Sequence, residues 1–230
     1  WLIGILGFIG VISNILAICV FSRKSLRKYS YSFFCVIMAI SDVFLLLHLF
    51  RHWASYILQA DLSSASQFFC TMDTYTENIA ATFSLWMLTV ISFDRLFTVV
   101  YPNRFKTFKK RWFQAIIVVV LLVYNIAVNL PLAIGFKIIN YYISPYLSIQ
   151  KCFISLSLNI SQSVILAVNF IFTIILVNNV VNVKIVWFLV SSRQKISESL
   201  GMAKVRKISS RDRKFTICSI GLNLNCMFFK

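Results

Sequence analysis

Long apolar runs, separated by short polar stretches, dominate the chain. A transmembrane helix takes about 20 mostly apolar residues to cross the hydrocarbon core of a bilayer, and five runs reach that length. A sixth run, at 215–229, is too short to cross alone and is expected to be a partial sixth helix. We therefore predict one all-α domain over 1–230, a polytopic transmembrane helix bundle. The predicted spans lie at about 2–21, 31–50, 68–100, 112–134 and 163–190.

The stretches between the runs set where these helices end. The third span is expected to stop at Tyr101-Pro102, because a residue before proline disfavours the α conformation. Its length of about 33 residues means that the helix tilts steeply or projects beyond the lipid. Residues 59–67 are polar, and 135–160 form a long stretch that contains Pro145. Both are predicted to be loops.

Basic residues gather in alternate connections. The stretches that follow the first, third and fifth spans contain 17 of the 23 lysines and arginines, whereas those after the second and fourth contain only Arg51, Lys137 and Lys151. Cytoplasmic loops of membrane proteins are rich in lysine and arginine. The pattern therefore predicts a multi-pass plasma-membrane protein with its N-terminus outside the cell.

Composition agrees with a lipid environment. The chain is 59% hydrophobic and 13% charged, with a mean hydropathy of +0.81, whereas a soluble domain is about 45–50% apolar and about 25% charged. The net charge of +16 would suit a nucleic-acid-binding protein. Its positive residues lie in clusters between apolar runs and not along one face, so no nucleic-acid partner is expected.

Few residues offer catalytic or metal chemistry. The only two histidines, His48 and His52, stand at one end of the second span, and no Cys-x-x-Cys or Cys/His cluster occurs. We therefore expect neither an enzyme nor a metal or cofactor site. A transporter is also disfavoured, because such folds show spans interrupted by glycine or proline and a repeat between halves, and neither is apparent.

Polar residues inside the apolar runs are candidates for function, because they are costly in lipid. Asn14 has an ordinary explanation as a hydrogen bond between helices. Asp42 is harder to explain, since a carboxylate in mid-span needs a cation, a proton or several donors. Asp73 and Glu77 are four residues apart, on one face near the outer end of the third span. They either meet a cationic ligand or are solvated or paired with Arg51, and both interpretations remain open.

Two cysteines and a sequon lie on the predicted outer side. Cys70 begins the third helix and Cys152 lies in the following outer loop, so an oxidising compartment makes a disulfide between them plausible. Such a bond would hold the loop across the mouth of the bundle. Asn159-Ile160-Ser161 matches the glycosylation sequon, although a three-residue match also arises by chance.

Short motifs follow one another along the first three spans. Each is weak alone, and their order and spacing add to their specificity. Cys70 stands 25 residues before Arg95. The motifs are Ser13-Asn14, Met38-Ala39-Ile40-Ser41-Asp42, Cys70, Asp94-Arg95-Leu96 and Pro102.

This set resembles the motifs of rhodopsin-like (class A) G-protein-coupled receptors. The resemblance implies a seven-transmembrane fold, an extracellular ligand, a heterotrimeric G protein inside and a disulfide between the two outer cysteines. It implies that Arg95 holds the inactive state through Asp94 and engages the G protein after the helices rearrange. Asp42 with Ser84 resembles the inner pocket for an allosteric sodium ion, and Asn14 belongs to the same polar core.

The ligand class follows less directly from the resemblance. Glu77 stands where amine receptors carry an aspartate for their ligand, and the different residue weakens an amine interpretation. The large outer loop and the third helix look closer to invertebrate neuropeptide or FMRFamide-type receptors, so a peptide ligand is favoured. A biogenic-amine receptor is the alternative.

The chain also departs from the family pattern. No tryptophan stands near the middle of the fourth span, where Leu122 and Tyr124 occur, and the fifth span has no proline. The Cys-Trp-x-Pro and Asn-Pro-x-x-Tyr motifs are missing, so most of helix six and all of helix seven are expected to be lacking. A truncated, non-signalling receptor fragment is therefore a further alternative.

Overall fold

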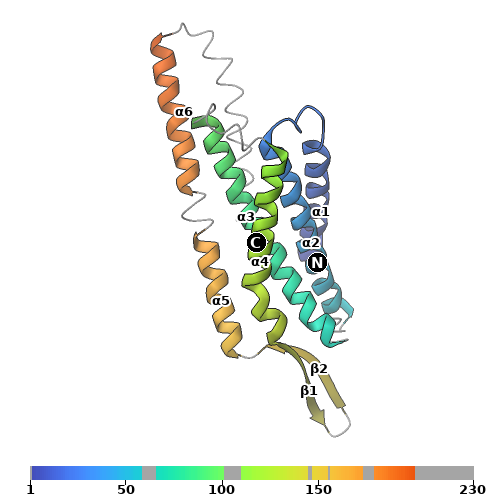
Figure 1. Ribbon diagram of the computed structural model, residues 1–230. Coiled ribbons are helices and arrows are strands. Elements are labelled where there is room, and N and C mark those ends of the chain that lie inside the picture. The colour runs from blue at the N-terminus through green and yellow to red at the C-terminus, as the bar shows by residue number, and fades with distance from the viewer. Residues whose placement is uncertain are drawn as a thin grey trace.

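The computed structural model describes residues 2–58, 66–100, 110–144, 147–154, 156–172 and 179–199, which form helices and one hairpin (Figure 1). Most of the helices run side by side, and the hairpin extends from one end of the bundle. The elements are α1 (Leu2–Phe21), α2 (Ser30–Leu58), α3 (Gln67–Val100), α4 (Arg111–Gly135), β1 (Phe136–Ser144), β2 (Leu147–Ile154), α5 (Leu156–Phe170) and α6 (Asn179–Ser199).

The helix boundaries follow the sequence predictions closely in the first four spans. α1, α3 and α4 begin and end within one residue of the predicted positions, whereas α2 continues past the predicted end at 50 to Leu58. The predicted fifth span at 163–190 covers parts of α5 and α6, and residues 173–178 between them lie outside the described residues. The predicted partial helix at 215–229 lies outside them as well.

The stretch at 135–160 is not the irregular loop that we predicted. β1 and β2 pair in antiparallel register from Phe136 opposite Ile154 to Ser144 opposite Leu147. The sequence of β1, FKIINYYIS, is rich in isoleucine and tyrosine, which favour the pleated conformation. α5 then starts at Leu156, inside the stretch that was expected to be a loop.

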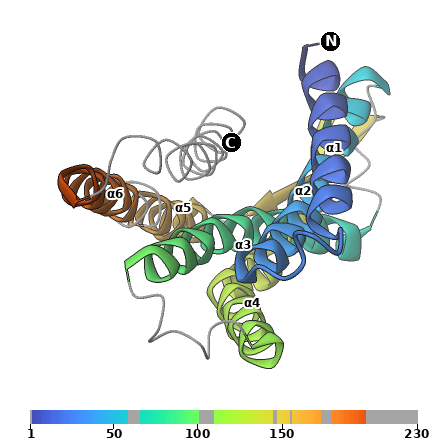
Figure 2. The same cartoon turned by 90° about the horizontal axis from the view of Figure 1, so that it is seen from above.

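α3 is the central helix of the bundle. Seen along the bundle axis, it has α1 and α2 on one side, α5 and α6 on the other, and α4 along its flank (Figure 2). Its first residues lie beside β1, at what we call the hairpin end of the molecule. The opposite end carries residues 22–29 and the start of α4, and we call it the basic end because Arg23, Lys24, Arg27, Lys28, Lys110 and Arg111 lie there.

α4 has the distribution of polar and apolar side chains that is expected of a helix in a lipid bilayer. Its buried positions include Gln114, Asn125 and Asn129, whereas Val119 and Val123 on its outer surface are more than half exposed. A helix in water would show the reverse arrangement, while in a bilayer polar side chains turn inward to find hydrogen bonds. Within the described residues, α1, α2, α3 and α4 each have the length and hydropathy to cross a membrane.

A cluster of buried apolar side chains joins α2 to α3. Its buried side chains leave little room between the two helices, so that polar groups on the same faces are held at fixed positions. The buried cluster consists of Phe34, Cys35 and Met38 from α2 with Phe83, Met87, Leu88 and Ile91 from α3.

Glycines let α1 approach α2 closely. They recur every three residues on one face of α1, and each faces a large side chain of α2, as small residues do at membrane helix interfaces. A Cβ on Gly7 would lie 3.4 Å from the Phe50 ring, which is ordinary contact, and a longer side chain would collide with it. The facing pairs are Gly4 with Trp53, Gly7 with Phe50 and Gly10 with Leu46.

We expect Gly7→Leu to destabilise the α1–α2 interface by about 1–3 kcal/mol, the usual cost of forcing extra methylenes into a packed site. Gly7→Ala should be tolerated, because its methyl group only reaches contact distance. Phe8→Leu is the matched control, since Phe8 is 62% exposed on the lipid-facing side. Thermal unfolding of the purified protein in nanodiscs measures the effect, and equal melting temperatures for the two Gly7 variants would contradict it.

Candidate functional site

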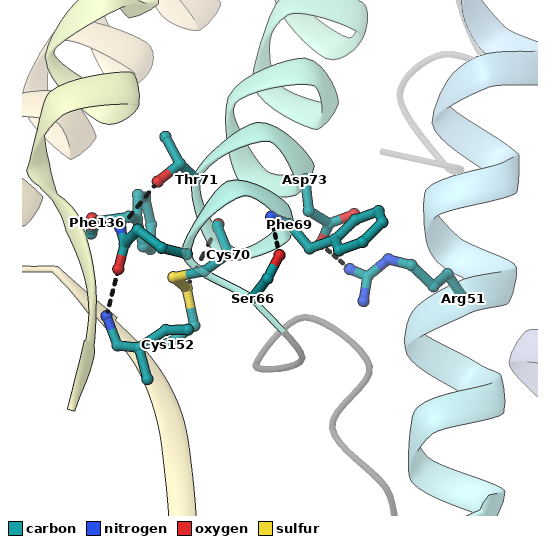
Figure 3. The surroundings of a disulfide bond; sticks show 10 residues. Arg51, Ser66, Phe69, Cys70, Thr71, Asp73, Phe136 and Cys152 are labelled. Carbon is teal, nitrogen blue, oxygen red and sulfur yellow. Dashed lines mark hydrogen bonds and ion pairs between the residues drawn. A yellow bond between two sulfur atoms is a disulfide. The ribbon is translucent and has the colours of Figure 1, made fainter. Parts of the chain in front are cut away.

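The hairpin is attached to the start of α3 by two kinds of bond. The predicted disulfide between Cys70 and Cys152 is confirmed, with the two Cα atoms 5.5 Å apart and Cys70 fully buried (Figure 3). The side-chain amide of Gln67 also donates to the Phe136 carbonyl at 2.7 Å and accepts from the Ile138 N–H at 3.0 Å. Gln67 thus pairs with the edge of β1 as a neighbouring strand would, and it fixes the hairpin over α3.

Local sequence explains why α3 begins where it does. Ser66 precedes the first helical residue, and its hydroxyl accepts the backbone N–H of Phe69 at 3.3 Å. Serine is a favoured N-cap because it satisfies a donor that the first turn leaves unpaired. This cap places Cys70 in the first turn, facing Cys152.

Carboxylates near the hairpin end of α3 pair with basic side chains of α2. Arg51 forms an ion pair with Asp73, and the two side chains point toward each other across the helix gap (Figure 3). The Nδ1 atom of His48 lies 3.0 Å from the other oxygen of Asp73, and the Nε2 atom of His52 lies 3.1 Å from Glu77. Asp73 is only 9% exposed. Of the two interpretations of Asp73 and Glu77, the pairing with α2 is therefore the arrangement observed.

These ion pairs also explain why α2 is longer than predicted. Arg51 and His52 suggested the end of an apolar span, but their side chains have partners on α3, so the helix continues through them to Leu58. Charged residues at membrane depth are tolerated where they pair with one another inside the bundle.

Halfway along the same interface, the side chains of Asp42 and Ser84 meet. The Ser84 hydroxyl donates to Asp42 at 2.5 Å, and the Ser41 hydroxyl donates to the Ala80 carbonyl at 2.9 Å. Asn14 donates its side-chain amide to the Gly10 carbonyl of its own helix at 3.0 Å. The helix-to-helix hydrogen bond expected for Asn14 is therefore replaced by an intrahelical one.

At the basic end, Asp94 and Arg95 contact the first two residues of α2. The Ser30 hydroxyl lies 2.6 and 2.8 Å from the two Asp94 oxygens, and Asp94 is 2% exposed. The Arg95 guanidinium lies over the ring of Tyr31, 5.4 Å from its centre. A carboxylate at a helix N-terminus is stabilised by the helix dipole. Asp94 thus holds the start of α2 against the end of α3, a contact that the sequence did not suggest.

Polar side chains also connect α3 to α4, and the sequence did not predict these contacts. Asn129 donates to the Thr82 hydroxyl at 3.4 Å, and the Tyr75 hydroxyl donates to the Ile126 carbonyl at 3.1 Å. A signal for it exists in the sequence, since Gln114, Asn125 and Asn129 are spaced by eleven and four residues and so share one helical face. Near the middle of α4, Tyr124 packs edge-on against Trp86 of α3.

Two predicted site residues are left without a structural test. Pro102 lies outside the described residues, and the side chain of Asn159, in α5, is not described either. Among the residues that are described, no group of three or more histidine, cysteine, aspartate or glutamate side chains is arranged to hold a metal ion.

Comparison with known protein families identifies the family of the chain. A family model described as 7 transmembrane receptor (rhodopsin family) matches residues 13–229, which is most of the chain. No curated protein matches it.

Proposed function

The chain belongs to the rhodopsin family of seven-transmembrane receptors, and we propose that it binds a peptide at the hairpin end and a heterotrimeric G protein at the basic end. Members of the family are non-enzymatic membrane receptors that signal through G proteins. The observation that supports this proposal most is the contact of Asp94 and Arg95 with the start of α2, because it is a polar contact that can break when the helices move.

The proposed orientation rests on two features at opposite ends of the bundle. Basic residues cluster beside the inner ends of α1, α2 and α4, as they do on the cytoplasmic side of membrane proteins. The disulfide joins α3 to the hairpin at the other end, and disulfides persist in oxidising surroundings. Both features support a location of the hairpin end outside the cell.

A peptide ligand suits the hairpin end better than an amine. An amine would need a carboxylate that is free to pair with it, whereas Asp73 is paired with Arg51 and His48, and Glu77 with His52. A two-stranded hairpin leaves backbone N–H and C=O groups along its outer edges, and extended peptides bind such edges by adding a strand. Gln67 already pairs with part of the β1 edge in this manner.

The signal would travel along the interface between α2 and α3. Polar contacts cross it along its whole length, including the Asp73 ion pairs at the hairpin end, Asp42 with Ser84 in the middle, and Asp94 with Ser30 at the basic end. The oxygens of Asp42 and Ser84 are of the kind that hard cations prefer, so they suit the allosteric sodium ion, which would supply positive charge beside the carboxylate. A ligand that binds one arrangement of these helices more tightly shifts the population toward it.

The ligand class is tested by replacing the acidic residues of α3. We expect Glu77→Gln to change the potency of an activating peptide by less than about threefold, because its carboxylate already pairs with His52. A panel of amidated peptides and a panel of monoamines would be applied to cells that express the protein, with G-protein activation as the readout. A different result would favour the amine alternative over the peptide proposal. In that result a monoamine activates the protein, and its potency falls about 100-fold or more in Glu77→Gln, as expected for a buried charge pair.

A further inference from the structure

Positive side chains gather where the turn between α1 and α2 meets the start of α4. The turn, residues 22–29, contributes four exposed cations, and α4 contributes Arg111, whose guanidinium donates to the Arg27 carbonyl. This hydrogen bond joins the two segments, which lie at the same end of the bundle (Figure 1). The side chains that we call the cationic patch are Arg23, Lys24, Arg27, Lys28 and Arg111.

The backbone of the turn is held in one conformation. The N–H groups of Leu26 and Arg27 both donate to the Arg23 carbonyl, at 3.0 and 2.9 Å. The Ser32 hydroxyl of α2 donates to the Leu26 carbonyl at 2.7 Å and ties the turn to the helix. A surface that is ordered before its ligand arrives loses less entropy on binding than one that must be ordered by it. The cationic patch is therefore preformed.

Among the described side chains, little negative charge balances the cationic patch. Of the acidic side chains that the structure describes, only Asp94 lies at the basic end, where it is 2% exposed and bound to Ser30. Neighbouring cations such as Arg23 and Lys24 repel each other, because salt screens exposed charges fully only beyond about 8 Å. A ligand with several negative charges would relieve this repulsion, so the patch suits a polyanion.

A tryptophan beside the patch indicates that it lies at the depth of lipid headgroups. Trp112 follows Arg111 at the start of α4 and is 57% exposed. Tryptophan is enriched where a bilayer meets water, and the next outward side chains of α4, including Ile116, Val119 and Val123, are apolar. Headgroup phosphates are therefore within reach of Arg111. Clusters of basic residues next to membrane helices bind such anionic lipids.

We propose that the cationic patch binds an anionic lipid whose headgroup carries several phosphates, of the phosphorylated inositol class, in the leaflet that borders the basic end. Guanidinium groups match phosphate oxygens with paired N–H groups, and Arg27 and Arg111 bring such groups to the junction of the turn with α4. The lysines of the turn neutralise further phosphates, and the acyl chains lie along the apolar surface of α4. A lipid suits this place better than an acidic protein surface, because Trp112 sets the patch at the rim of the bilayer.

A row of stacked side chains connects the patch to Arg95. The Nζ atom of Lys28 lies 5.3 Å from the ring centre of Tyr29, and the rings of Tyr29 and Tyr31 stack with their centres 5.5 Å apart. The Arg95 guanidinium lies over the Tyr31 ring. A phosphate that binds Lys28 competes with the Tyr29 ring for its charge and weakens one end of this row. This coupling to Arg95 rests on the proposed function, whereas lipid binding itself does not.

Native mass spectrometry of the purified protein in a neutral detergent measures lipid binding, because it resolves the kind and number of bound lipids. Phosphatidylinositol bisphosphate, phosphatidylserine and phosphatidylcholine would be supplied in equal amounts. We expect the bisphosphate lipid to bind at least about tenfold more tightly than phosphatidylcholine, since each cation near an anionic lipid contributes about fivefold. Equal binding of the three lipids, or a preference for the singly charged phosphatidylserine, would overturn the proposal.

Arg27→Gln removes one cation of the patch but keeps the backbone carbonyl that accepts from Arg111. We expect it to weaken binding of the bisphosphate lipid about three- to fivefold, and Lys24→Gln should reproduce the effect. Lys137→Gln is the matched control, because it removes one exposed positive charge from β1 at the hairpin end, and it should change the affinity less than about twofold. Equal losses in all three variants would show that the lipid responds to overall charge and would contradict the proposal.

A competition experiment distinguishes a lipid from a soluble phosphate. Free inositol trisphosphate, which has the phosphates of the headgroup but no acyl chains, would be added to the protein with bound bisphosphate lipid. We expect it to displace the lipid only at a concentration at least about tenfold higher than that of the lipid, because it cannot bury apolar surface against α4. Displacement at equal concentration would overturn the assignment to a lipid.

The coupling to Arg95 needs a functional measurement. Guanine-nucleotide exchange on purified G protein would be recorded in nanodiscs with and without the bisphosphate lipid, and we expect basal exchange to rise about two- to fivefold with the lipid. Lys28→Gln should remove most of this difference. Equal exchange in both nanodiscs would refute the coupling, whereas lipid binding without exchange under any condition would refute the proposed function and leave the lipid site intact. Reduced exchange in Arg27→Gln with unchanged lipid binding would show that the patch binds the G protein instead.

Discussion

Replacing Cys70 with serine is expected to remove most of the protein from the cell surface and abolish peptide binding. The disulfide closes a loop with a sequence separation of 82 residues, and chain entropy gives such a cross-link about 4–5 kcal/mol. This figure is an upper bound, because membrane helices persist in the unfolded state. Without the bond the hairpin depends on Gln67 for its attachment to α3, and that pair of hydrogen bonds contributes about 1–3 kcal/mol.

Surface labelling and ligand binding measure the effect, and a double mutant identifies its origin. Cys152→Ser should match Cys70→Ser, and the variant that lacks both cysteines should be no worse than either, because one bond is lost in all three. Cys19→Ser is the control, since Cys19 is an exposed free cysteine. Additive losses in the double variant would show that the two side chains act separately.

Replacing Arg95 with alanine is expected to reduce G-protein activation at least tenfold while surface expression and peptide binding persist. The Arg95 guanidinium lies over Tyr31 at the end of α3, where release from the ring would free its charge for a partner protein. A cation over an aromatic ring contributes about 0.5–1 kcal/mol at partly exposed sites. Tyr31→Leu should therefore raise basal activation about two- to fivefold.

The matched control for Arg95→Ala is Lys110→Ala, which removes an exposed positive charge from the same end of the bundle. It should lower activation less than twofold, as expected for a solvated surface charge. Guanine-nucleotide exchange on purified G protein measures both variants. Equal losses in the two would mean that the basic end acts through its overall charge and not through Arg95.

The sequence predicted the parts of the fold that depend on composition over many residues. Apolar runs of about 20 residues located α1 and α4 within one residue of their observed ends. The hairpin at 136–154 was missed, because its pairing depends on register between strands and on anchoring by Gln67 and the disulfide, which connect distant segments.

Among the site residues, too, some contacts were predicted from the sequence and others were not. Asp42 with Ser84 was expected from the motif pattern, and the structure brings the two side chains together. The Ser30 partner of Asp94 lies 64 positions away along the chain, and nothing in the local sequence of either residue marks the contact. The contact of His48 with Asp73 was missed for a similar reason, since it needs α2 and α3 at a fixed helical register.

One measurement tests most directly the claim that a peptide signal at the hairpin end reaches a G protein at the basic end. The protein would be reconstituted in sealed vesicles with the hairpin end outward and purified G protein enclosed, and guanine-nucleotide exchange would be followed after peptides are added outside. We predict exchange that depends on external peptide and is lost in Arg95→Ala. An absence of exchange with every peptide and monoamine of the panels, or equal exchange in Arg95→Ala, would contradict the account.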